Sequence, residues 1–389
     1  MTTKLPPPSF AVASAAHPPP APHRTRHKRT HRAGLDIVAI GPPECCEYHL
    51  SARALPGEDA RTLINRVADA LREFEIQPVM QFTFASLNQL QCSLPVFDEI
   101  LGPARWPVTR VDGRGCQGEL AGIQIVGVSP RPVQSIYQHD RVVGCYFDDE
   151  FSENCFLGGL EPTHLGVGDS AETRETLANM ESALGQAGFA LCDIVRTWFY
   201  LDDLLSWYKT FNDARTEFYR NHTFVSRAFP ASTGISAKNL SGSALTAAAW
   251  AVQPLDNLRI REVASPLQCP ASDYKSSFSR AMELDTPEGR RLFISGTASI
   301  APGGETICKG DGRAQIATTM KVVEAILDSR GMTLEDTTRA IAYFKNPADG
   351  IEFTDWFKYH GRPLPPFVHS TCDICRDDLL FEIELDAFA

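Results

Sequence analysis

Amphipathic helices recur three times along the chain, and a strand follows each of them. In each predicted helix the apolar residues fall three or four positions apart, which places them on one helical face. These positions are Leu63, Val67, Leu71 and Phe74 in the first helix, Leu177, Met180, Leu184 and Ala187 in the second, and Val323, Ile326 and Leu327 in the third. The segments "PVMQFTFAS", "DIVRTWFYL" and "TTRAIAYFK" follow and are rich in β-branched and aromatic residues, as strands are. A second, weaker helix is predicted after each strand.

Each segment also ends in the same way, with a bulky apolar residue and a proline, then a loop, then a final apolar strand. The bulky residues are Trp106, Phe229 and Leu364, and they are spaced at nearly equal intervals. Internal similarity at even spacing indicates repeated units. The sequence therefore predicts three α+β units, over residues 35–130, 131–255 and 256–389, of which the first is the most divergent.

A single unit of this kind would leave one face of its sheet uncovered, because its helices pack on the other face. Three sheets can cover one another if they meet around a central axis. We therefore expect a pseudo-threefold axis with the sheets around it, the helices outside and clefts between units, where ligands are favoured. A chain that closes on itself does not need two further subunits, so we expect a monomer or a weak dimer.

The N-terminal segment differs from the rest in composition. Residues 1–34 are rich in proline, alanine and basic residues and cannot form a core, so they are predicted to be a disordered tail. The basic run from His23 to Arg32 could also contact nucleic acid or bind metal through its histidines. A solvated tail is the simpler interpretation.

The composition of the whole chain limits its partners. The 389 residues carry a net charge of −11, which argues against general binding of nucleic acid. No apolar run is long enough to span a bilayer and no export signal is visible, so we expect no membrane association. The 11 cysteines are odd in number and mostly scattered, unlike a secreted disulfide framework. These features favour a soluble cytoplasmic protein.

A pair of cysteines, Cys372 and Cys375, has the spacing of metal and redox motifs. A structural zinc site needs four ligands, and beyond His369 no further ligand is apparent. Redox pairs usually open a helix after a strand, whereas this pair precedes the terminal strand. We therefore expect no metal here, and Cys375 either lines a pocket or packs in the core.

The third unit resembles the RidA/YjgF family through "RLFISGTASIAPGGE", "QIATTMKVVEAILDSRGMTLEDTTRAIAYFK" and "LLFEIELDA". The second unit resembles it through "CFLGGLEP", "LANMESALGQAGFALCDIVRTWFYL" and "FPAST", and the first only in outline. In RidA enzymes an arginine after "FPA" binds the substrate carboxylate, and the first glutamate of "EIE" positions a water. The arginine positions here hold Ser232 and Phe367, which argues against imine deamination. The glutamate is present only in unit three, as Glu382, which indicates one chemical site per chain. At the position of this glutamate, unit two has Thr246 or Ala247, and unit one has only apolar residues and Gln124.

Three such units with "VRTWFYL", "YKSSFSRAMEL" and "CDICRDDLLFEIELDAF" are similar to the chorismatase family, and to its hydroxybenzoate-forming subtype. Those enzymes use this fold to release pyruvate from chorismate. The resemblance implies that Glu382 is the proton donor. It also implies that Ala281 and Cys375 line the pocket and steer the product toward 3-hydroxybenzoate, with 4-hydroxybenzoate beside it as in pigment-pathway members of the family.

The residues around Glu382 agree with a role as an acid. Protonation of an enol-ether carbon is slow and needs a positioned acid with a raised pKa. Leu380, Phe381 and Ile383 flank Glu382, and apolar surroundings raise the pKa of a carboxyl group. We expect Glu384, two residues on, to be the exposed glutamate of this strand.

The two carboxylates of chorismate call for arginines, whose planar guanidinium binds a carboxylate through two hydrogen bonds. Arg196 lies mid-strand among apolar neighbours and shares a strand face with Trp198 and Tyr200. Arg280 and Arg376 are the other candidates. We therefore predict that Arg196, Tyr200, Arg280 and Arg376 bind the substrate.

The favoured function is thus a chorismatase that forms 3-hydroxybenzoate and pyruvate. The alternatives are hydrolysis of chorismate to a dihydroxycyclohexadiene acid, an imine or enamine deaminase of the RidA kind, and a non-catalytic metabolite-binding protein. No nucleotide- or metal-binding motif is present, and cleavage of an enol ether needs no cofactor, so none is predicted.

Overall fold

The computed structural model describes residues 27–42 and 46–389, and these residues form three six-stranded mixed sheets with six α-helices. We call residues 27–129 unit 1, residues 134–254 unit 2 and residues 259–389 unit 3. The boundaries expected near residues 130 and 255 fall in the short connections between the sheets. The structure confirms the α+β class and the three repeated units.

All three sheets have the same strand order. The strands of unit 1, in their order across the sheet, are β1 (His27–Arg32), β2 (Leu35–Ile40), β3 (Cys46–Arg53), β6 (Leu120–Ser129), β4 (Gln77–Ala85) and β5 (Val108–Asp112). Those of unit 2 are β7 (Gln134–Gln138), β8 (Arg141–Asp148), β9 (Ser152–Leu160), β12 (Leu245–Pro254), β10 (Ile194–Leu201) and β11 (Ala231–Ser236). Those of unit 3 are β13 (Arg259–Val263), β14 (Ala281–Thr286), β15 (Gly289–Ala298), β18 (Phe381–Phe388), β16 (Thr337–Phe344) and β17 (Phe367–Thr371).

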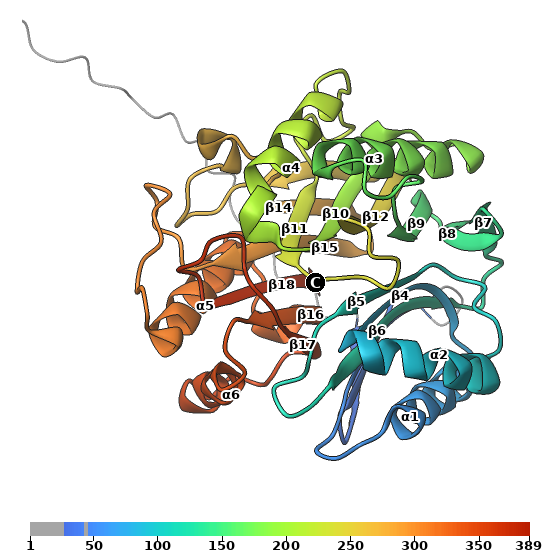
Figure 1. Ribbon diagram of the computed structural model, residues 1–389, viewed down its shortest axis with the longest axis horizontal. Helices are drawn as coiled ribbons and strands as arrows, with labels where there is room; N and C mark the ends of the chain where they lie inside the picture. The colour runs from blue at the N-terminus through green and yellow to red at the C-terminus, as the bar shows by residue number, and fades with distance from the viewer. Residues whose placement is uncertain (1–26, 43–45) are drawn as a thin grey trace, which may run out of the picture.

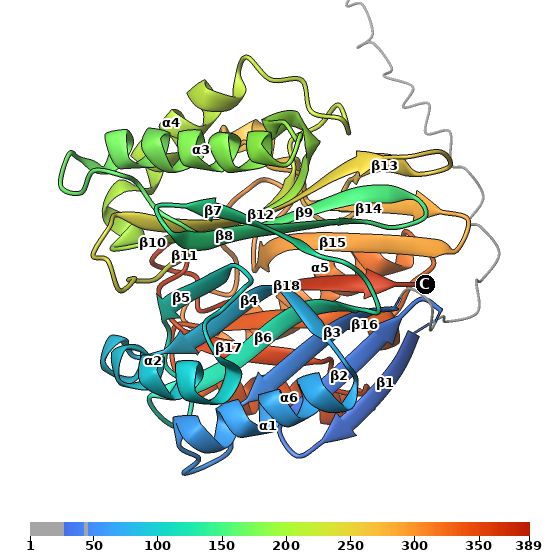
Figure 2. The ribbon, with the colours of Figure 1, turned by 90° about the vertical axis from the view of Figure 1, so that its right-hand side faces the viewer.

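Each unit has two α-helices on the outer face of its sheet. They are α1 (Ala60–Glu73) and α2 (Leu87–Leu101), α3 (Asp169–Gln186) and α4 (Leu204–Tyr219), and α5 (Gly312–Asp328) and α6 (Asp349–Tyr359). Figure 1 shows the three pairs at three corners of the molecule with the sheets between them, and Figure 2 shows the same arrangement from the side. An aspartate caps the first helix of unit 1 and of unit 3: Asp59 accepts a hydrogen bond from the Thr62 N–H at the start of α1, and Asp311 from the Ala314 N–H at the start of α5.

The inner faces of the three sheets form one central core. Aromatic side chains from different units meet there: the rings of Phe82 and Trp198 are 5.3 Å apart, and the hydroxyls of Tyr200 and Tyr343 are 3.4 Å apart. The predicted packing of sheets around a pseudo-threefold axis is therefore correct. Among the described residues, no helix combines the length and apolarity needed to cross a membrane.

The disordered tail was expected to extend to residue 34, and this boundary was wrong. Residues 27–32 form β1, which pairs antiparallel with β2, and Arg29 and His31 on this strand contact the buried carboxylate of Asp36 at 2.8 Å. Acids far along the chain or in the next strand accommodate this basic run, since Arg32 is also paired with Glu73, and composition alone does not reveal such pairs. The rest of the predicted tail, residues 1–26 with His23, lies outside the described residues.

An ionic network lies in the centre of the core. Glu384 accepts hydrogen bonds from Arg196 and Arg339, and also from Trp198 Nε1 at 2.6 Å. Burial would raise the pKa of Glu384, but the two guanidinium groups hold it below its ordinary value. The expectation that Glu384 is exposed was therefore wrong, because the final strand is buried on both faces.

Candidate active site

Clefts lie between neighbouring units on all three sides of the molecule. Cleft 2/3, between units 2 and 3, has a volume of about 390 Å³. Cleft 3/1, between units 3 and 1, has a volume of about 500 Å³, and cleft 1/2, between units 1 and 2, about 640 Å³. The three clefts therefore follow the repeat of the fold, and the residues that line them decide which of them can carry chemistry.

The strand register distinguishes cleft 2/3 from the others. Glu382 on β18 lies opposite Tyr343 on β16, and the corresponding pairs are Gly122 with Phe84 in unit 1 and Thr246 with Tyr200 in unit 2. Only one of the three equivalent positions thus holds an acid. Glu382 lines cleft 2/3, which makes this cleft the candidate active site.

The carboxyl group of Glu382 is held in a nearly enclosed position. The residue is 4% exposed. Burial raises the pKa of Glu382 to about 8, the negative charge of Glu384 adds to the rise, and Arg280 and Arg196 oppose it. Glu382 is therefore largely protonated at neutral pH and can donate a proton, as a general acid requires.

Strands from two units fix the surroundings of Glu382. The Ser232 N–H on β11 donates to Ser295 Oγ on β15 at 2.9 Å, and the Gly296 N–H donates to Thr233 Oγ1 at 3.2 Å. These bonds hold unit 2 against unit 3 along the cleft. Gly296 leaves room for the acid, since a Cβ atom at this position would overlap Glu382 Oε1.

We predict that Gly296→Ala displaces the carboxyl group of Glu382 and lowers turnover at least tenfold, since misplacing a reacting group by about 1 Å can cost 10²-fold. The backbone of Gly296 does not have a positive φ, so the fold should be retained. Steady-state kinetics and circular dichroism would measure the two effects. Gly185→Ala, whose added methyl group meets nothing within 4 Å, is the matched control, and equal activity of the two variants would contradict the prediction.

Arginines from both units line the same cleft. Arg280 Nε donates to Cys269 O at 3.0 Å, and Arg376 Nη1 donates to Gly304 O at 2.7 Å. Arg215 on α4 donates through Nη2 to Asn212 Oδ1 at 2.7 Å and through Nη1 to Ser232 Oγ at 3.3 Å. Lys275 adds a further cation to the lining, whereas Lys209 is paired there with Asp213 at 2.6 Å. The cleft therefore offers a neutral acid surrounded by cationic groups, which suits a substrate with carboxylates.

Four of the predicted site residues come together in cleft 2/3: Glu382, Arg280, Cys375 and Arg376. Arg196 and Tyr200 do not line it, because they lie in the core, bonded to Glu384 and close to Tyr343. Ala281 is fully buried in the core of unit 3, beside Arg280 rather than in the cleft. We therefore no longer assign Arg196, Tyr200 or Ala281 to the substrate.

Several lining residues were not predicted. They are Tyr208, Asn212, Arg215, Ser232, Gly234 and Gly296. Arg215 had a weak signal in the sequence: "FPAST" has Ser232 where RidA enzymes have an arginine, so an arginine from elsewhere could take its place. In the structure Arg215, on the preceding helix, donates to Ser232. Gly296 has no signal in a single sequence, because its role is to leave space for Glu382.

The two spaced cysteines behave as neutral thiols. Burial, followed by the charge of Glu382, raises the pKa of Cys375 to about 12 and that of Cys372 well above its ordinary value. Among residues 27–42 and 46–389, no group of His, Cys, Asp and Glu has the arrangement of a metal site. Cys375 lies in the cleft lining, and the absence of a cofactor stays a prediction.

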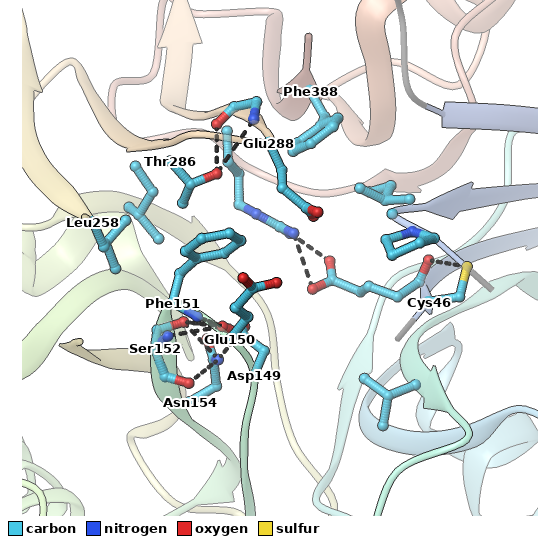
Figure 3. A pocket seen from close by; sticks show the side chains of 18 of the residues that line it. Cys46, Asp149, Glu150, Phe151, Ser152, Asn154, Leu258, Thr286, Glu288 and Phe388 are labelled. Carbon is cyan, nitrogen blue, oxygen red and sulfur yellow. Dashed lines mark hydrogen bonds and ion pairs between the residues drawn. The ribbon is translucent and has the colours of Figure 1, made fainter. Parts of the chain in front are cut away.

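A smaller cavity of about 130 Å³ lies at another meeting point of the three units, near the last residues of the chain. Figure 3 shows Glu150, Glu288 and Phe388 in this cavity. Its half-buried cation, Arg291, is paired with Glu47, and Asp149 accepts from the Phe151 and Ser152 N–H groups at 2.8 Å. The inner charged groups are thus already matched, and cleft 2/3 remains the stronger candidate.

Comparison with known proteins agrees with this architecture. The family model described as endoribonuclease L-PSP matches residues 159–246. A RutC family protein of Pyrococcus horikoshii is 31% identical over 101 residues, which cover 26% of this chain and 80% of the relative. A 3-hydroxybenzoate synthase of Streptomyces hygroscopicus is 26% identical over 239 residues, which cover 54% of this chain and 68% of the relative.

A solved structure extends the comparison to all three units. The crystal structure of a chorismatase matches with a TM-score of 0.59 and 20% identity, over 80% of this chain and 92% of that chain. The chain belongs to the RutC family, and its three linked units share the fold of the chorismatase structure.

Proposed function

We propose that this protein is a chorismatase, which releases pyruvate from chorismate and forms 3-hydroxybenzoate. The observation that carries the proposal is the buried Glu382, whose pKa is raised by burial, in a cleft lined by arginines. Two relatives from Streptomyces hygroscopicus support it by their names, 3-hydroxybenzoate synthase and chorismatase. The direct test is to incubate the protein with chorismate, without added metal or cofactor, and to measure pyruvate. A folded protein that releases none would exclude the proposal.

The proposed mechanism starts with the acid. Glu382 donates its proton to the terminal methylene carbon of the enolpyruvyl group, and the ether carbon becomes positively charged. Arg280, Arg376 and Arg215 bind the two carboxylates and so place the enol ether beside Glu382. Bound carboxylates add negative charge near Glu382 and favour its protonated form. All these steps use side chains of the chain itself.

Two products compete after protonation. If water attacks, the products are pyruvate and a dihydroxycyclohexadiene acid, and one water is consumed. If the ring hydroxyl of the substrate displaces the pyruvyl group instead, the ring becomes aromatic and 3-hydroxybenzoate forms without net consumption of water. Cys375 lines the cleft close enough to Glu382 for the carboxylate to affect its thiol. A neutral thiol is a poor hydrogen-bond partner and does not hold a water well. We therefore propose that Cys375 favours 3-hydroxybenzoate.

We predict that Cys375→Ala opens space for a water and raises the share of the dihydroxycyclohexadiene acid severalfold. Chromatography of the products from both proteins measures this share. Cys308→Ala, at an exposed cysteine, is the control. An unchanged product ratio in Cys375→Ala would mean that Cys375 does not steer the reaction. A share of 4-hydroxybenzoate would appear in the same chromatogram.

We also propose that the protein works as a monomer or weak dimer in the cytoplasm. All three clefts are formed within one chain, so catalysis does not require residues of another subunit. Light scattering that found an obligate trimer would contradict this arrangement.

A further inference from the structure

Cleft 3/1 has the same position between units as the candidate active site but a different lining. It lies between β17 and α6 of unit 3 on one side and β3 with the loop over residues 115–120 of unit 1 on the other. Gly122 stands where unit 3 has its catalytic acid, so this cleft lacks a proton donor at that position. Its apolar walls come from Phe344, Phe367, Leu120 and Ile351.

Arg53 brings a positive charge into this cleft. Its side chain is only 18% exposed, and its guanidinium lies over the ring of Phe367 at 4.3 Å. The nearest carboxylate, Asp36, is 3.9 Å away and also contacts Arg29 and His31 at 2.8 Å. Within the described part of the chain, the guanidinium of Arg53 makes this ion pair and the ring contact but no side-chain hydrogen bond. Such a group can still bind an anion through its N–H donors.

His369 supplies a second donor near Arg53. The Cys116 N–H donates to His369 Nε2 at 3.0 Å, so the proton of the neutral ring is on Nδ1. Burial, followed by the charge of Arg53, lowers the pKa of His369 to about 4 and keeps the ring neutral. No acceptor for Nδ1–H is found among residues 27–42 and 46–389.

The acidic residues of cleft 3/1 are already engaged. Glu58 is paired with Arg66 at 2.7 Å, Glu119 with Arg114 at 3.1 Å, and Asp59 caps α1. They therefore do not compete for Arg53. What remains is one cation, one neutral donor and flat apolar walls, the set of contacts that fits a carboxylate on a planar apolar ring.

We propose that cleft 3/1 is a second binding site, which holds a small aromatic carboxylate through Arg53 and His369 without converting it. The ring packs against the apolar lining beside Leu120 and Ile351, and the carboxylate lies at the guanidinium. The site depends on residues of units 1 and 3 only, so it is separate from the chemistry of cleft 2/3 and does not rest on the proposed reaction.

The test is calorimetric titration of the full chain with benzoate and with benzamide, which has the same shape but no charge. Benzoate should bind and benzamide should bind at least tenfold more weakly. Arg53→Met should weaken benzoate binding at least tenfold, because a hydrogen bond to a charged group is lost. Gln117 lines the cleft and is exposed, so its variants should fold. Gln117→Glu should weaken benzoate binding about twofold to fivefold and Gln117→Lys should strengthen it.

The exposed Lys209 of cleft 2/3 provides the matched control. Lys209→Gln should leave the benzoate site of cleft 3/1 unchanged, even if a second, weaker site in cleft 2/3 is affected. Benzoate binding that responds to Lys209→Gln but to none of the Arg53 and Gln117 variants would overturn the proposal. Equal affinity for benzamide and benzoate would overturn it too. Pyruvate release from chorismate is a separate measurement, so this proposal can fail while the proposed function stands.

Discussion

Glu382→Gln should lower the turnover of chorismate by about 10²–10⁴-fold, the usual contribution of a general acid. The amide keeps the shape and the hydrogen-bonding capacity of the side chain but cannot transfer a proton. Chorismate should still bind, because the arginines that line the cleft are unchanged. Kinetics and equilibrium binding measure the two quantities separately.

The pH dependence gives a second view of the same acid. The reaction needs protonated Glu382, whose pKa is raised to about 8, so wild-type turnover should be maintained at neutral pH and fall as pH rises through about 8. Glu288→Gln, in the smaller cavity, is the control and should keep both the rate and the pH profile. If Glu382→Gln turned over chorismate at a near-normal rate, Glu382 would not be the acid.

Glu384→Gln should lower the free energy of unfolding by about 3–5 kcal/mol, the usual cost of leaving buried charges uncompensated. Glu384 lies between Arg196 and Arg339, all three fully buried, and the amide removes the negative charge that balances them. Arg339 keeps its contact with Asp386 at 2.8 Å, but Arg196 has no other acid within salt-bridge distance among the described residues. Chemical denaturation measures the loss.

The same substitution should also affect the chemistry. The charge of Glu384 raises the pKa of Glu382, while Arg196 lowers it. The substitution removes the charge of Glu384 and leaves the charge of Arg196 unbalanced, and both effects lower the pKa of Glu382. Activity should therefore be lost at a lower pH than in the wild type. Glu99→Gln, which removes one partner of the exposed pair with Arg61, is the control and should change stability far less. Equal losses in the two variants would show that the central ionic network does not stabilise the fold.

The repeat and the packing of the three sheets could be predicted from the sequence, because helical periodicity, strand composition and the recurring proline all follow the units. The place of Glu382 in a cleft could also be predicted, since Glu382 lies in an apolar strand and stands in only one of three equivalent segments, while its role as the acid stays a prediction. These features are local in sequence, and the structure retains them.

The arginines could not be assigned in the same way. Arg196 and Arg280 both lie in or beside apolar strands, yet Arg196 pairs with Glu384 in the core and Arg280 lines the cleft. The difference depends on which face of each strand turns toward a neighbouring unit. It also depends on Glu384, which was expected at the surface and instead neutralises two buried arginines. Contacts between units decide such assignments, and a single sequence does not contain them.

The most direct measurement is the reaction in D₂O with mass spectrometry of the pyruvate. If Glu382 donates its exchangeable proton to the methylene carbon, each pyruvate formed from chorismate should carry one deuterium in its methyl group when it is trapped at once by reduction to lactate. The product share should not affect this result, since protonation precedes the choice between water and the ring hydroxyl. Glu382→Gln should form deuterated pyruvate at least about 10²-fold more slowly than the wild type. Pyruvate without deuterium, or no pyruvate from folded protein, would contradict the account.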